Sequence, residues 1–363
     1  MTTPTLPKLS LALAAAVLAG ACASGPSGPA SESFGRVPAP GQEVLYPAPP
    51  DTTRVQFLVA ISSEGDIRGE GGGGPSVLKP YGVEAGNGRI FVCDLDLHGI
   101  TIFDLRDQSF HRFVPGGRGA LQAPVNCSVD PETGFLYVAD GRRSDVVVFD
   151  STLTYVDHIK MELGRPGDVF VDGDTLWVSD MERGVVDVYE KSSRRWVRSI
   201  RGGERGTEGA LTQPANIWVR GDRLYVSDFG SFRIKIYDRA GNHLQTVGSY
   251  GRKIGQFLRP KGVGVDAEGR IYVADAAIAT VQLFNPQGEL LLFFGGPYGG
   301  LGGLWLPAGL TIVDDPVEVD RFRSYVIPGY ELEYLILVAN QFGPDKVSVY
   351  GFVTPAQGST VGP

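Results

Sequence analysis

Three side chains whose oxygen atoms could serve as metal ligands occupy equivalent positions in this chain. Asn126, Asp168 and Asn216 each lie two residues after a proline. Carboxylate and amide oxygens are the ligands that hard cations such as Ca²⁺ prefer, but Ca²⁺ usually takes six to eight of them. One carboxylate and two amides therefore indicate at most a weak Ca²⁺ site. The alternative role for such side chains is hydrogen bonding to the backbone of a turn.

The three residues belong to a unit that occurs six times. Each unit opens with a proline, and the prolines recur about every 45 residues, at Pro80, Pro124, Pro166, Pro214, Pro260 and Pro307. An apolar phrase ending in Asp or Asn follows each of them, at residues 91–94, 137–140, 177–180, 225–228, 272–275 and 337–340. Short β runs repeated at this period are typical of a propeller. We predict an all-β, six-bladed β-propeller with four-stranded blades over residues 51–353.

The last blade has no room for a fourth strand before the tail. Residues 54–61 have the pattern of a fourth strand that no other strands precede. We therefore expect this segment to pair with the last blade, so that no strand edge is left open at the seam. The same blade contains an insertion over residues 314–333, which is either a functional loop on a rigid frame or a decorated turn at the seam.

Aspartates end five of the six second strands, at Asp94, Asp140, Asp180, Asp228 and Asp275. A ring of carboxylates could be read as catalytic. However, a group present in every blade is better explained by the repeat geometry, in which Asp accepts hydrogen bonds from turn amides. We predict a structural role for these aspartates.

The N-terminus has the features of a targeting segment. Lys8 precedes an apolar stretch over residues 9–19 that is too short to span a bilayer. Residues 18–22 resemble a bacterial lipobox, with Cys22 as the lipidated residue, although residues 19–21 also fit ordinary signal-peptide cleavage. We predict a signal peptide over 1–21, a lipid-anchored Pro/Ser/Gly-rich tether over 22–50 and a disordered tail over 354–363. Residue 23 is alanine rather than aspartate, which favours an outer-membrane lipoprotein facing the periplasm or the exterior.

Several units resemble the NHL repeat. Residues 260–266 (PKGVGVD) and 269–275 (GRIYVAD) follow its consensus almost letter for letter, and residues 233–238 (RIKIYD) match its third strand. The chain is also similar to a group of bacterial six-bladed propeller lipoproteins, which share residues 49–54, 334–343 and 349–352. These resemblances imply the fold and an envelope location, and they imply no particular activity.

The wider family of NHL-type propellers includes lyases with histidine-bound zinc and lactonases with calcium. The four histidines, His98, His111, His158 and His243, fall on outer strands and turns, so they are not expected to converge on a zinc ion. The lactonase resemblance lacks its first-blade glutamate, where Gly82 stands. A divalent-cation-dependent lactonase or lyase, centred on Asn126, Asp168 and Asn216 at the channel mouth, is the alternative function.

Arginines and aromatics collect in the links between blades and in the turns between second and third strands. These segments all lie on one face of a propeller. The predicted partner-binding residues are Arg118, Arg142, Arg143, Arg183, Arg205, Phe229, Phe232, Arg252 and Phe342. Arginine with exposed aromatics is the composition of a protein-docking surface. A scatter of solvated charges, interleaved with Asp96, Glu182 and Glu204, is the competing interpretation.

We therefore predict a non-catalytic module that binds an envelope protein or peptide and needs no cofactor. A structural role in a larger envelope assembly is the third possibility. The net charge of −8 argues against general nucleic-acid binding. Cys93 and Cys127 are expected to be small core residues in adjacent blades, where a disulfide is permitted but not required.

Overall fold

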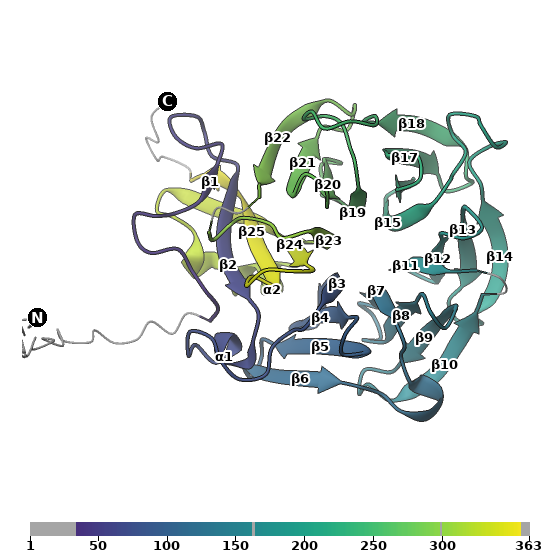
Figure 1. Ribbon diagram of the computed structural model, residues 1–363, viewed down its shortest axis with the longest axis horizontal. Coiled ribbons are helices and arrows are strands. Elements are labelled where there is room, and N and C mark those ends of the chain that lie inside the picture. Colours follow the sequence, from purple (N-terminus) through teal and green to yellow (C-terminus); the bar gives the residue numbers. More distant parts are fainter. Residues whose placement is uncertain (1–33, 162–163, 298–299, 357–363) are drawn as a thin grey trace, which may run out of the picture. The chain divides into compact units, whose positions relative to one another are not determined.

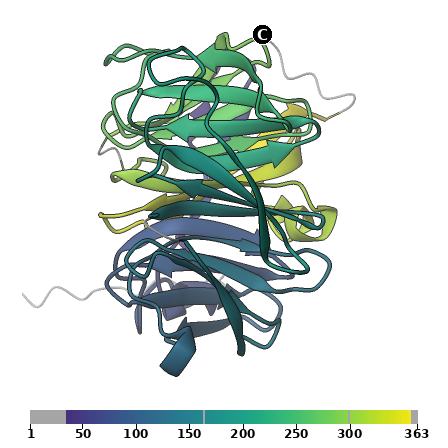
Figure 2. The same ribbon diagram turned by 90° about the vertical axis from the view of Figure 1, so that its right-hand side faces the viewer.

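The computed structural model describes residues 34–161, 164–297 and 300–356. It confirms the predicted all-β propeller: five four-stranded antiparallel sheets and one five-stranded sheet form six blades arranged in a ring (Figure 1). Figure 2 shows the ring from its side, with the outer strands of the teal blade toward the viewer. The first strand of each blade contacts the first strands of both neighbouring blades, so these six strands surround the axis.

Blades 1 to 5 each use four consecutive strands. Blade 1 contains β3 (Pro80–Gly86), β4 (Arg89–Asp94), β5 (Gly99–Asp104) and β6 (Ser109–Phe113). Blade 2 contains β7 (Pro124–Val129), β8 (Leu136–Asp140), β9 (Asp145–Phe149) and β10 (Tyr155–Lys160). Blade 3 contains β11 (Pro166–Asp172), β12 (Thr175–Asp180), β13 (Val185–Glu190) and β14 (Arg195–Ile200).

Blade 4 contains β15 (Pro214–Arg220), β16 (Arg223–Asp228), β17 (Arg233–Asp238) and β18 (His243–Val247). Blade 5 contains β19 (Pro260–Val265), β20 (Ile271–Asp275), β21 (Thr280–Phe284) and β22 (Leu290–Gly295). Blade 6 contains β23 (Pro307–Val313), β24 (Tyr330–Asn340), β25 (Val347–Pro355), β2 (Val55–Ile61) and β1 (Leu45–Tyr46). A short 3₁₀ turn, η1 (Gly117–Gly119), lies in the link between blades 1 and 2.

The repeated proline and aspartate act together at the start of each blade. Pro260 pairs with Asp275 across the first two strands, and the register shifts beside the proline, which cannot donate to the ladder. The Asp275 carboxylate accepts hydrogen bonds from the backbone N–H groups of Leu258 (2.7 Å) and Ala277 (2.9 Å). The residues that end the other second strands, Asp94, Asp140, Asp180, Asp228 and Asn340, likewise accept from the link. The structural role predicted for the aspartates is confirmed.

The ring closes as the sequence predicted. Strand β2 pairs antiparallel with β25, and β1 adds a fifth strand outside it. The segment from Phe34 onward also packs on the propeller: Gly35 N–H donates to the Asp66 carbonyl (2.7 Å), and Arg36 pairs with Asp345 (3.0 Å). The second half of the predicted tether, over residues 34–50, is therefore packed against blade 6 rather than extended away from it.

The insertion in blade 6 packs at the seam. It contains α2 (Pro316–Asp320) and the 3₁₀ turn η2 (Arg323–Tyr325). The rings of Phe322 and Tyr325 meet that of Phe34 edge-on, at centroid distances of 5.4 and 5.7 Å. The Glu318 carboxylate accepts from the backbone N–H of Gly88 in blade 1 (2.5 Å). These contacts favour the interpretation of the insertion as part of the closure.

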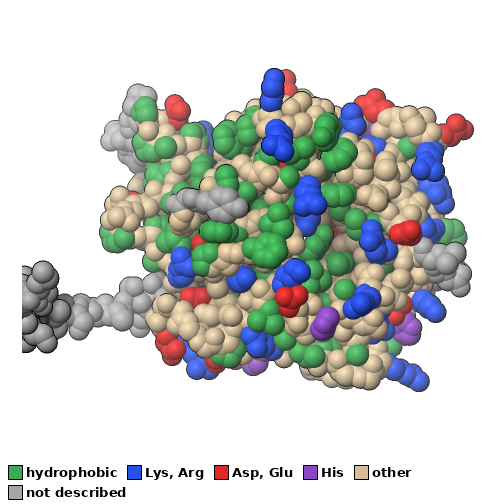
Figure 3. Space-filling model, viewed as in Figure 1, with side chains coloured by type: hydrophobic (Ala, Val, Ile, Leu, Met, Phe, Trp, Pro, Cys, Tyr) green, Lys and Arg blue, Asp and Glu red, His purple; other side chains and the backbone are tan. Residues whose placement is uncertain are grey.

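We call the face that carries the links and the turns between second and third strands the link face. Apolar side chains of neighbouring blades pack together in shared clusters. The short helix α1 (Glu64–Ile67) lies in the link between β2 and blade 1. Figure 3 shows Lys and Arg side chains spread among hydrophobic ones on one face of the ring. Among the described residues, no helix has the length and apolar composition needed to span a membrane.

Candidate functional site

The three residues predicted to bind a cation do come together near the axis. Asn126, Asp168 and Asn216 lie on the first strands of blades 2, 3 and 4, and all three are buried. The Asn126 side-chain amide donates to Asp168 Oδ1 (2.6 Å), and the Asn216 amide donates to Asp168 Oδ2 (3.3 Å). The three side chains therefore form a bridge that joins three blades.

Both oxygens of the Asp168 carboxylate accept two hydrogen bonds each from N–H donors. Its Oδ1 also accepts from the backbone N–H of Val169 (2.7 Å), and its Oδ2 accepts from that of Ile217 (2.9 Å). Asn126 turns its own carbonyl oxygen to the backbone N–H of Cys127 (3.1 Å). Donors rather than oxygens thus surround the carboxylate, so this arrangement does not fit a divalent cation, which needs oxygen ligands.

In blades 1, 5 and 6, glycine occupies the position that Asn126, Asp168 and Asn216 hold in blades 2, 3 and 4. A Cβ added to Gly82, Gly262 or Gly309 would lie 2.7–2.8 Å from backbone atoms of the next blade. Blades 5, 6, 1 and 2 therefore approach each other through their backbones, whereas side-chain hydrogen bonds join blades 2, 3 and 4. The position that suggested a metal site is where the innermost strands touch.

A second carboxyl group, not singled out from the sequence, lies near this bridge. Glu84 of β3 is half-buried, and its carboxylate accepts a hydrogen bond from the Thr311 hydroxyl (3.2 Å). Burial, with a smaller effect from the Asp168 charge, raises the pKa of Glu84 to about 8. Burial also raises the pKa of Asp168 to about 7, against the effect of its four donors. Glu84 was missed because Thr311 and Asp168 become its neighbours only when the ring closes.

The two core cysteines are free thiols in contact across blades 1 and 2. Cys93 and Cys127 are both buried. A hydrogen bond between the thiols, together with burial, raises the pKa of Cys127 well above its usual range. The pair therefore fits the prediction of small core residues. Cys22, the predicted lipidation site, lies outside the described residues.

Two of the predicted partner-binding arginines hold the link face together. Arg143 donates to Asp145 (2.9 Å) and to the carbonyls of Arg118 and Ala120, and its side chain is only 13% exposed. Arg183 pairs with the buried Asp187 (2.6 Å). Because their donors are engaged within the fold, replacement of either arginine would disturb the links themselves.

The other predicted residues are distributed over the link face. Arg118, Arg142, Arg205 and Arg252 are exposed, whereas Phe229 and Phe232 are half-buried. Phe342 of blade 6 is 54% exposed. The ring of Phe232 meets that of Tyr250 at 4.8 Å, and Tyr250 is 63% exposed. Tyr250 escaped the sequence analysis because it lies in an irregular link, where no repeat position marks it.

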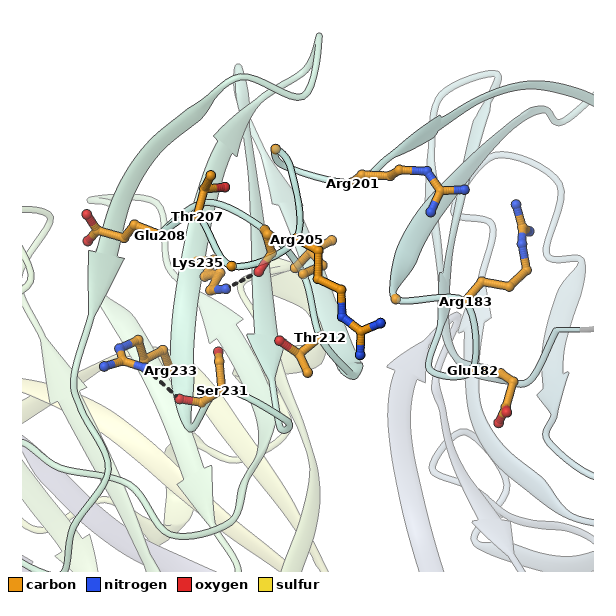
Figure 4. A pocket seen from close by; sticks show the side chains of 15 residues that line it. Glu182, Arg183, Arg201, Arg205, Thr207, Glu208, Thr212, Ser231, Arg233 and Lys235 are labelled. Atoms are coloured by element: carbon orange, nitrogen blue, oxygen red, sulfur yellow. Dashed lines mark hydrogen bonds between the residues drawn. The ribbon is translucent and has the colours of Figure 1, made fainter.

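A pocket of about 730 Å³ lies between blades 3 and 4 on the link face. Its wall is made by the link over residues 201–212 and by the neighbouring turns, and its basic residues are Arg183, Arg201, Arg205, Arg233 and Lys235. The guanidinium groups of Arg183, Arg201 and Arg205 point toward the same space, whereas the Glu208 carboxylate points away from it (Figure 4).

The basic residues of this pocket differ in how far they are neutralised. Lys235 is buried and pairs with Asp228 (3.1 Å), and Arg183 is paired as described above. Arg201 and Arg205 are exposed, and among the described residues no side-chain hydrogen bond or ion pair engages either of them. The pocket thus offers two free guanidinium groups beside a fixed one, which is a geometry suited to carboxylates.

Comparisons with solved structures support the fold. The chain is similar to the hydrazine synthase of Kuenenia stuttgartiensis (TM-score 0.50, 15% identity, covering 78% of this chain and 97% of that chain). It is also similar to virginiamycin B lyase from Staphylococcus aureus (TM-score 0.50, 9% identity, 78% and 87% covered). A protein of unknown function from Bacteroides thetaiotaomicron aligns with a TM-score of 0.58 at 14% identity, covering 83% of this chain and 76% of that chain.

At these identities the likeness shows the fold alone. No protein-family model matches the chain, and no curated protein matches it. The resemblance to the NHL repeat therefore stays a prediction, whereas the six-bladed β-propeller is shown.

Proposed function

We propose that this chain is a bacterial envelope lipoprotein, anchored through Cys22, whose propeller is a non-catalytic binding module. Its partner is an envelope protein that inserts an acidic segment into the pocket between blades 3 and 4. The observation that carries this proposal is the convergence of Arg183, Arg201 and Arg205 on one pocket, two of them without a partner in the described part of the chain.

The chemistry of the pocket favours carboxylates as its ligands. A guanidinium group presents parallel N–H donors that match the two oxygens of a carboxylate. Arg183 is fixed by Asp187, so it is preorganised, and the pocket beside it has a volume of about 730 Å³. The exposed rings of Tyr250 and Phe342, elsewhere on the link face, add apolar surface that a protein partner can cover.

The same geometry gives little support to the enzymatic alternative. Asp168, the carboxylate at the centre of the proposed cation site, has four N–H donors on its two oxygens. A metal-assisted lactonase or lyase would need to break this bridge between blades before a cation could bind. The binding module requires no rearrangement.

The proposal can be tested with a short fluorescein-labelled oligoglutamate peptide and the full chain. We expect salt-sensitive binding by the wild type, and a loss of at least about tenfold in the double variant Arg201→Glu/Arg205→Glu, because like charges would face the peptide. The matched control is Arg195→Glu, since Arg195 has a side chain 77% exposed and begins the outer strand of blade 3. Equal binding by the double variant and the control would overturn the proposal.

A further inference from the structure

Three more basic side chains lie where the innermost strands begin, at the axis of the ring. Arg165 directly precedes the proline of blade 3, and Arg259 and Lys261 flank that of blade 5. Because β11 and β19 begin on the link face and surround the axis, these three residues lie near the axis on that face. The group is separate from the pocket between blades 3 and 4, whose lining residues include none of them.

Lys261 reaches across blade 6 to blade 1. Its ammonium nitrogen lies 4.4 Å from the centroid of the Tyr81 ring, which directly follows the proline of β3. Strand β23 of blade 6 lies between β19 and β3, and at the equivalent position it carries the fully buried Ala308. A small residue there leaves the space that Lys261 crosses, and the contact with Tyr81 is a cation–π interaction.

These cations are not neutralised by the protein. In the described ranges, no ion pair involves Arg165, Arg259 or Lys261. Burial and the nearby Arg259 charge lower the pKa of Lys261 to about 8. Burial raises the pKa of Tyr81, and the charges of Arg165 and Arg259 oppose that shift.

The two acids deeper along the axis do not compensate for this charge. Glu84 lies three residues beyond Tyr81 on β3, which is about 10 Å along a strand. Asp168 has all its lone pairs directed at N–H donors, as described above. The Lys261 ammonium group is partly enclosed and has no counter-charge, which is unfavourable, and an anion bound beside it would stabilise its charge.

We propose that the link-face end of the ring axis, where Tyr81, Arg165, Arg259 and Lys261 lie, is a binding site for the oxyanion group of a small molecule, either a carboxylate or a phosphate. The two guanidinium groups supply directional donors, and Lys261, held over Tyr81, supplies the third charge. A ligand can reach the four side chains from solvent, because all of them retain exposed surface.

The test uses the full chain at low salt with two probes, citrate and inorganic phosphate, measured by calorimetry and by thermal shift. We expect saturable binding of at least one probe, and the better of the two identifies the preferred oxyanion. Lys261→Gln and Arg259→Gln should each weaken binding by about tenfold or more, because each removes one of three converging charges. Lys253→Gln is the matched control, since Lys253 is exposed in the link that precedes blade 5.

A pH series gives a second readout. Above pH 8 Lys261 loses its charge, so affinity for either probe should fall as the pH rises through that value. Glu84 becomes negative over the same range, so Lys261→Gln should show a smaller fall, and Lys261→Gln/Glu84→Gln should show least. If Lys261→Gln does not fold, Arg165→Gln tests the loss of one charge from blade 3, and it should bind more weakly than the wild type while keeping the pH dependence of Lys261. The proposal is overturned if neither probe binds saturably, or if the charge-neutralised variants bind as the wild type does.

Discussion

At the scale of single residues, Asp168 shows how a repeat position can take on a local role. Its carboxylate joins β7, β11 and β15 through two side-chain amides and two backbone N–H groups. Buried polar groups cost free energy unless they are hydrogen-bonded, and this bridge satisfies four donors with one side chain. The residue that looked like a metal ligand therefore contributes chiefly to the stability of the ring.

The bridge can be tested by Asp168→Asn. The amide keeps the size of the side chain but turns an NH₂ group toward two of the donors, so we expect the free energy of unfolding to fall by roughly 2–4 kcal/mol. Urea denaturation measures the change. Asp222→Asn is the control, because Asp222 is 91% exposed in a turn. A loss no larger than that of the control would show that the bridge adds little stability.

Glu84 predicts a pH dependence of stability. Its pKa is raised from an ordinary value of 4.5 to about 8, so the folded protein holds this proton more tightly than the unfolded chain does. The corresponding stability is fully present below about pH 4.5 and is lost as the pH rises through 8. Asp168, with its pKa raised to about 7, adds a dependence of the same sign.

The variant Glu84→Gln removes the first of these contributions. We expect its melting temperature to match the wild type near pH 5 and to exceed it by several degrees near pH 9. Differential scanning calorimetry at both pH values measures the difference. Glu132→Gln, at an exposed turn, should follow the wild type. Parallel pH curves for Glu84→Gln and the wild type would contradict the assignment.

At the scale of elements, blade 6 carries the features that distinguish this ring from a plain repeat. Strand β2 closes the ring, β1 adds a further strand, and the insertion with α2 packs against the segment that begins at Phe34. Sequence reasoning predicted the closure, because a lone fourth-strand pattern had only one place to pair. It did not predict the packing of residues 34–50, since that stretch has no periodicity that indicates a partner.

Truncation tests the packing of this segment. A chain that begins at residue 33 keeps every described contact, so its melting temperature should equal that of the longer chain. A chain that begins at residue 51 loses the Arg36–Asp345 pair, strand β1 and the ring contacts of Phe34. We expect its melting temperature to be lower by several degrees, since a loss of about 2 kcal/mol lowers it by roughly 4–8 °C. Identical melting curves for the two truncations would show that residues 34–50 act only as a tether.

Residues of the candidate sites could be predicted from the sequence only where a position in the repeat marks them. The period and the proline positions predicted the blades, and the recurrence of Asp94 and its equivalents predicted their structural role. The contact between Lys261 and Tyr81 crosses a whole blade, so no local pattern indicates it. The convergence of Arg201 and Arg205 likewise depends on the path of an irregular link.

At the scale of the whole molecule, an acidic chain presents basic sites on one face. The net charge is −8, yet basic groups collect on the link face, in the pocket between blades 3 and 4 and near the ring axis. Such an uneven distribution orients an acidic partner before contact and speeds its association. In the proposed account, the link face meets the partner and the N-terminal lipid holds the protein at the membrane.

The most direct test of this account is site-specific photo-crosslinking in cells of the native host. A photoreactive amino acid replaces Thr207, in the wall of the pocket, or Thr152, in an exposed turn of blade 2 as the control. We predict that position 207 links to one dominant envelope protein through an acidic segment, and that Arg201→Glu/Arg205→Glu abolishes this product. No product from position 207, or the same product from position 152 or from the charge-reversed variant, would contradict the account.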